Sequence, residues 1–104
     1  MEQHVSNSRE IISKLQLALY NEAEILHHVE QSIQDDLVNN DPEAQALLDT
    51  ALQHAMHSFR EIGYELNAYG GFELMQSSIY TISNAGFGIV PIEHAWNGIG
   101  DWVA

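Results

Sequence analysis

The feature that most constrains the fold is a row of apolar residues in the middle of the chain that recurs at alternating spacings of four and three. Its members are Leu48, Leu52, Ala55, Phe59, Ile62, Leu66 and Tyr69. Seven residues make about two turns of an α-helix, so this row lies along one helical face. Asp41 and Pro42 are typical of a helix start, and Gly70-Gly71 of a helix end. We therefore predict a helix over residues 42–69.

An earlier row predicts a helix over residues 8–38. Its members are Ile12, Leu15, Leu19, Leu26, Val29 and Ile33, with Ile11, Ala18 and Ile25 beside them. Glu22 interrupts the row at a position that should face the partner helix. A buried carboxylate is costly unless it is paired. Glu22 is therefore either a functional group or, as we favour, a structural one, which sets the register or oligomeric state or lies where the row is incompletely covered. Asn39-Asn40 leaves only a short connection, so the two helices should form an antiparallel hairpin.

The last third of the chain, residues 72–104, fits more than one structure. An apolar stripe predicts a third, shorter helix, although this stretch is also rich in strand formers; the stripe is Phe72, Met75, Ile79 and Ile82. The tail fits either a helix that starts at Pro91 or a β-hairpin that turns at Asn97-Gly98. Both interpretations place the same four residues on one face: Ile92, Trp96, Ile99 and Val103. We prefer the helix because the preceding two-thirds of the chain is helical in pattern.

Together these patterns predict an all-α fold, in which a helical hairpin carries a shorter third helix and a docked C-terminal segment. A length of 104 residues suits a single domain. Gly63 lies beside the second apolar row, where a missing side chain permits another helix to approach closely. The N-terminal residues are polar and no apolar run is long enough to span a bilayer, so we expect neither a signal peptide nor a membrane span, and a cytoplasmic location.

The charge narrows the range of partners. Fifteen Asp and Glu face three Lys and Arg, which gives a formal net charge of −12. Between Lys14 and Arg60 the chain has eight acidic residues and no Lys or Arg. Proteins bind nucleic acid by neutralising phosphates with cations, and three cations are too few, so direct nucleic-acid binding is not expected. An electrostatic hold on anionic lipid is excluded for the same reason, and any partner chosen by charge should be basic.

The first helix contains a spacing that occurs in metal sites. Glu24 and His27 stand in Glu-x-x-His spacing, as do ligands of di-metal helical bundles. Such ligands project into a bundle core, whereas these two residues fall on the outer face of the predicted helix. The pattern therefore predicts an exposed helix face rather than a metal site.

The second helix carries a better row for a divalent ion. His54, His57 and Glu61, continued by Glu65, lie close together on a helix surface. Two His and a carboxylate can hold a metal ion. The row is on the outer face, however, and the sequence supplies no second shell to orient the ligands. His54, His57 and Glu61 are the candidates for a surface metal site, but we predict no bound metal and no cofactor.

No catalytic pattern stands out. The chain has no cysteine, no nucleophile elbow and no phosphate-binding glycine loop. We therefore expect a non-enzymatic protein–protein interaction module, either self-associating or adaptor-like. The apolar stripe of the first helix is broader than one partner helix needs, which predicts an oligomer, with a homodimer as the expected form.

The candidate partner-binding residues are Glu24, Glu30, Asp35, Asp36, Trp96 and Trp102. The acids suit a basic partner, and the tryptophans either dock the tail or anchor a partner. A first alternative function is DNA mimicry, in which the acidic surface occupies a nucleic-acid-binding protein. Over the roughly 46 Å of a helix spanning residues 8–38, duplex DNA carries about 27 phosphates, whereas this helix carries six acids. A second alternative is a surface metal-binding protein.

Overall fold

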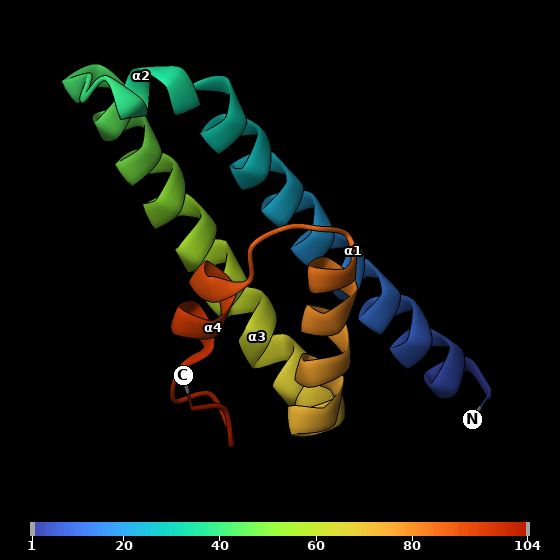
Figure 1. The fold of residues 1–104 in the computed structure, drawn as a ribbon. Helices are drawn as coiled ribbons and strands as arrows, with labels where there is room; N and C mark the ends of the chain where they lie inside the picture. The colour runs from blue at the N-terminus through green and yellow to red at the C-terminus, as the bar shows by residue number, and fades with distance from the viewer. Residues whose placement is uncertain (1, 104) are drawn as a thin grey trace.

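The structure, a computed structural model, describes the backbone of residues 2–103 and the side chains of residues 8–103. Over this range the chain forms helices and no strand. The helices are α1 (Glu2–Ser32), α2 (Gln34–Val38), α3 (Pro42–Asn84) and α4 (Val90–Trp96). The all-α prediction is confirmed. Helices α1 and α3 run antiparallel and give the molecule an elongated outline of 57 × 24 × 21 Å (Figure 1).

The hairpin turns where the sequence predicts. The Asp41 side chain caps α3 by accepting a hydrogen bond from the Glu43 backbone N–H at 2.9 Å, and Pro42 takes the first helical position. The helix predicted over residues 8–38 ends at Val38 as expected, but its start and its continuity differ from the prediction. It begins earlier, at Glu2, and it breaks at Ile33, whose φ of −113° is not helical, before the short α2.

The buried row on α1 is shorter than the predicted one, since Ile12, Val29 and Ile33 are only half-buried, and it takes a different path in the middle. Leu15, Leu19, Ala23 and Leu26 are buried, so that spacings of four, four and three replace the strict heptad. The row therefore passes through Ala23 rather than Glu22, and the Glu22 side chain is half-buried. This placement agrees with the interpretation that Glu22 occupies an incompletely covered position.

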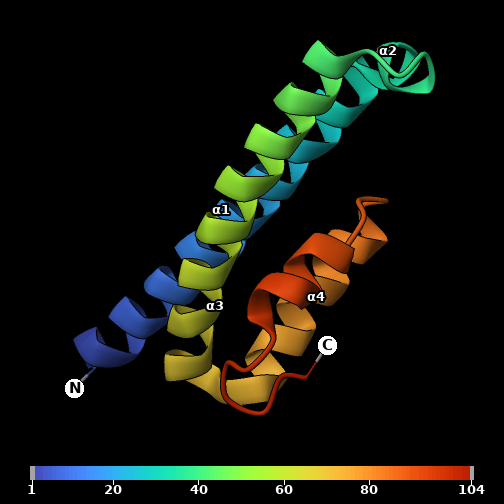
Figure 2. The same cartoon turned by 90° about the vertical axis from the view of Figure 1, so that its left-hand side faces the viewer.

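Gly71 reverses the chain direction within α3. Its backbone has φ +67° and ψ −158°, a combination that is essentially confined to glycine. The helix therefore stops at this point, as predicted, and residues 72–84 run back beside the hairpin as a shorter helix, here called the return arm (Figures 1 and 2). Met75, Ile79 and Ile82 of the return arm are buried against the hairpin.

The tail forms a helix, and the alternative β-hairpin is absent from the described residues. Helix α4 is shorter than predicted because Gly98 and Gly100 adopt positive φ values of 88° and 56°. The chain then forms a compact turn in which the Gly98 N–H donates to the Trp102 carbonyl at 2.9 Å. Val103 is 84% exposed, so its predicted place on the apolar stripe is wrong.

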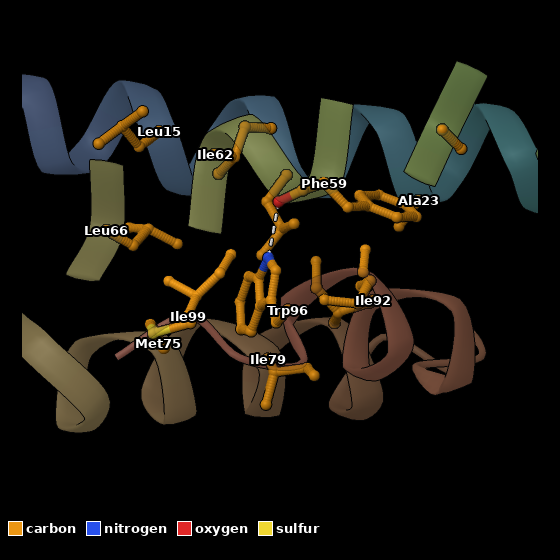
Figure 3. Close-up of a cluster of buried hydrophobic side chains, with 14 of the residues drawn as sticks. Leu15, Ala23, Phe59, Ile62, Leu66, Met75, Ile79, Ile92, Trp96 and Ile99 are labelled. Atoms are coloured by element: carbon orange, nitrogen blue, oxygen red, sulfur yellow. Dashed lines mark hydrogen bonds between the residues drawn. The ribbon is translucent and has the colours of Figure 1, made fainter. Parts of the chain in front are cut away.

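Trp96 joins α4 to α3 (Figure 3). Its indole is fully buried, and the Nε1–H donates a hydrogen bond of 2.6 Å to the Phe59 carbonyl oxygen. The indole lies against Gly63, where a Cβ atom would overlap Cδ1 and Nε1 of the ring. Gly63 therefore permits a close approach, but what approaches is the Trp96 side chain and not the backbone of another helix.

Arg60 donates hydrogen bonds to backbone carbonyls at the C-terminal end of α4. Its Nη1 donates to the Ala95 carbonyl at 2.7 Å and to the Asn97 carbonyl at 3.2 Å. Carbonyls at a helix C-terminus lack hydrogen-bond donors within the helix, so the guanidinium supplies the donors that they need. The Trp102 ring packs edge-on against Trp96 at 5.1 Å and extends the same core.

We predict that Gly63→Ala destabilises the protein by about 1–3 kcal/mol, because the added methyl group overlaps the indole and the core must shift. The measurement is the midpoint of urea unfolding, monitored by circular dichroism. Gly88→Ala is the matched control, since a Cβ at Gly88 meets nothing within 4 Å. It should change stability by less than about 0.5 kcal/mol. Equal stability of the two variants would contradict the packing described for Trp96.

Candidate functional site

The hairpin is covered along only part of its length. The return arm, the following loop and α4 lie against one part of α1 and α3, and the other part extends beyond them toward α2 (Figures 1 and 2). On α1, Phe87 of the loop packs on His27, with ring centroids 5.0 Å apart. On α3, Phe59 accepts the Trp96 hydrogen bond. Residues 28–54 lie beyond these contacts and are here called the projecting arm.

The projecting arm has almost no core. Ala44 is the single buried residue of the arm, with an exposed fraction of 3%. Leu48 and Leu52, which belong to the predicted row on α3, are only half-buried here. The same row is fully buried farther along, at Phe59 and Leu66, where the tail covers it. Two helices alone therefore leave the apolar seam of the arm accessible.

An apolar groove lies on this arm between α1 and α3. It is lined by Val29, Glu43, Ala46, Leu47, Thr50, Ala51 and His54. The six lining residues from α3 recur at helical spacing, so they form one continuous face of about three turns, or roughly 16 Å. Leu47 projects at this face and is 59% exposed.

The sequence prediction missed this groove. It assigned the widened apolar stripe to Ile11, Ala18 and Ile25 of α1, and of these Ala18 packs against the core while the other two stay exposed. The signal for the groove was on α3, where Leu47 is apolar but stands outside the seam. A single apolar residue at an outer position is common, so only the uncovered surroundings make it informative.

The projecting arm is strongly acidic, and one of its acids, Glu43, lines the groove. The projecting arm has no Lys or Arg. It carries six acids, which are Glu30, Asp35, Asp36, Asp41, Glu43 and Asp49. Its formal charge with neutral histidines is therefore −6, half of the total of −12. Three of the four acids predicted to meet a partner, Glu30, Asp35 and Asp36, are exposed on this arm. Glu24 lies outside it and is half-buried on α1.

The two tryptophans that the sequence offered as partner anchors are part of the core instead. Trp96 is fully buried and Trp102 is buried beside it. Phe72 stacks on Trp102 with centroids 5.3 Å apart. Of the two roles suggested for these residues, the structure places them in the first, which is docking the tail onto the hairpin.

The metal candidates do not converge. His57 Nε2 and Glu61 Oε1 form an exposed pair at 3.0 Å, whereas His54 lines the groove. Within residues 8–103 no three His, Asp or Glu side chains come together in a way that could hold an ion. His27 was predicted on an outer face, but Phe87 covers it, so it does not join Glu24 as an exposed pair.

Among the described residues, no helix combines the length and the apolar character that crossing a membrane requires. Comparisons with protein-family models, with curated protein sequences and with solved structures give no match to this chain.

We predict that the amides of residues 46–52 exchange with solvent at least about 10-fold faster than those of residues 60–66, after correction for intrinsic rates. Local stability follows buried apolar contact, which is sparse in the projecting arm, where only Ala51 and Leu52 at its inner end pack against the core cluster. Both segments belong to α3, so the helix serves as its own control. Native-state hydrogen exchange measured by NMR would decide, and equal protection in the two segments would show that the arm is stabilised in some other way.

We also predict that zinc binds only weakly, because a surface His and a carboxylate without a third ligand make a poor site. The test is calorimetric titration of the wild-type protein and of the His54→Ala/His57→Ala variant. The two proteins should give the same weak response. A submicromolar affinity that disappears in the variant would restore the metal-binding alternative.

Proposed function

We propose that the protein is a non-enzymatic interaction module that docks on another protein chain through its projecting arm. The observation that supports this proposal is the contrast between the two parts of the hairpin. One part is packed around Trp96, and the other has a single buried residue, Ala44, and presents an apolar groove. Helices in water are held mainly by packing of an apolar face, and an exposed apolar patch rimmed by polar residues marks an interaction site.

The division of the molecule suits an adaptor. The part that holds Trp96, Phe59 and Leu66 supplies a core of its own, so it can support an arm that is completed only by a partner. The proposed setting is the cytoplasm, on the sequence grounds given above. A partner selected by charge would be basic, because the arm contains no cation.

The acidic arm also favours a second candidate, an inhibitor that imitates DNA and fills a basic nucleic-acid-binding groove. The six acids and the lack of Lys or Arg on the arm support this alternative. The two proposals differ in what they require of the groove. A DNA mimic presents carboxylates and does not need Leu47, whereas a docking module places Leu47 at the centre of the contact.

Site-specific photocrosslinking in the cells that naturally make the protein tests the proposal. A photoreactive benzoylphenylalanine would replace Leu47 in one variant and Leu17 in another. Leu17 is the matched control because it is also 59% exposed and lies on α1 outside the arm. We expect protein adducts at position 47, mapped by mass spectrometry to one segment of one protein, and none at position 17.

An adduct between two copies of this chain at position 47 would also support an interaction module, in its self-associating form. Adducts of equal yield at both positions, or none at either, would refute the proposed docking surface. Retention of a captured basic partner by a Leu47→Asn variant would instead favour the DNA-mimic alternative.

A further inference from the structure

We propose that the occupant of the groove is an amphipathic helix from another protein, with an apolar stripe on one face and Lys or Arg beside it. This inference rests on the proposed function and adds the chemistry of the partner.

The form of the groove suits a helix. Its α3 wall is a face of about three turns, and Val29 of α1 forms the opposite side. Ala46, Thr50 and Ala51 are small, so a third helix can approach the backbone closely, while Leu47 stands as a larger side chain that inserts between residues of that helix. Apolar residues spaced three and four apart on the incoming helix would meet this surface.

The protein already uses this solution in its other part. There, the return arm lies along the hairpin (Figure 2), and the Gln16 side chain of α1 donates a hydrogen bond of 3.0 Å to the Ser78 hydroxyl. Met75, Ile79 and Ile82 of the return arm are buried in the core cluster that α1 and α3 also form, and Figure 3 shows Met75 and Ile79 of this cluster. Residues 72–84 extend too little to cover the projecting arm as well, because the following loop turns at Gly86 and leads into α4. A helix from outside would give the projecting arm the third layer that the return arm gives the rest.

The charge decides between possible occupants. A second copy of this chain would bring six further acids to a surface that already has six and no Lys or Arg. The chain's own cations lie elsewhere, since Arg9 and Lys14 precede the arm, and Arg60 is engaged with the Ala95 and Asn97 carbonyls. Glu43 lies within the groove lining itself. Like charges at a contact disfavour association and opposite charges favour it, so a basic helix is the complementary partner.

Three synthetic peptides of about 18 residues, or five helical turns, test this inference by calorimetric titration in physiological salt. The first has Leu along one helical face and Lys elsewhere. The second has the same composition in scrambled order, and the third keeps the Leu face but replaces Lys with Glu. We expect the first peptide to bind the wild-type protein at least about 10-fold more tightly than either of the others.

Two variants locate the binding site. Leu47→Asn should weaken binding of the first peptide by about 10-fold or more, because it removes apolar contact from the centre of the groove. Leu17→Asn is equally exposed in the wild-type chain and should leave the affinity within about 2-fold. Urea midpoints of both variants confirm that they are folded, and backbone amide shifts should change at residues 43–54 when the first peptide is added.

The other outcomes overturn the inference. Equal binding of the scrambled peptide would mean that charge alone suffices, and equal binding of the Glu peptide would mean that charge is irrelevant. Equal losses in the Leu47→Asn and Leu17→Asn variants would place the contact elsewhere. If no peptide binds while position 47 still forms adducts with another protein, the interaction module stands and the basic helix is refuted. Adducts at position 47 to a second copy alone would make the groove a self-interface.

Discussion

The hydrogen bond from the Trp96 indole to the Phe59 carbonyl, made across Gly63, is the contact on which the rest of the arrangement depends. An indole can reach a helix backbone only where a side chain is missing, so the position of Gly63 determines where α4 docks. Since α4 is short and is followed directly by the turn at Gly98 and Gly100, the tail cannot extend its coverage along α3. The boundary between the packed part and the projecting arm is therefore a consequence of one glycine and one tryptophan.

The sequence predicts the long elements because their signals are local and repeated. The row on α3 needs no tertiary information, and neither does the Asp41-Pro42 start or the stop at Gly71. The tail is different, because a helix and a hairpin place Ile92, Trp96 and Ile99 on one face alike. What separates the two structures is the packing of Trp96 against Gly63, a contact between residues far apart in the chain. The shift of the α1 row from Glu22 to Ala23 also depends on tertiary packing, since Ala23 is buried in the core cluster.

The candidate site was harder to predict than the fold for a related reason. Its exposed acids, Glu30, Asp35 and Asp36, follow from composition and helical periodicity. The groove does not, because it exists only where the tail fails to cover α3, and a longer tail would bury Leu47 and Ala51. A docking surface of this kind is defined by what fails to cover it. The tryptophans show the converse, since large apolar residues near a terminus suggest a partner anchor until the core that they complete is known.

Charge and burial act together in the projecting arm. Six acids without a cation repel one another, which lowers the stability of a segment that already lacks a core. A partner with both an apolar face and positive charge would cover the exposed apolar surface and also neutralise the repulsion among the acids. An apolar partner without charge would do only the first. Anything that binds the folded arm and not its opened form also stabilises it in proportion to the logarithm of its concentration. In the proposed complex the acidity of the arm would therefore act beyond solubility, because it would keep the free arm marginally stable and would restrict the helices that can bind it.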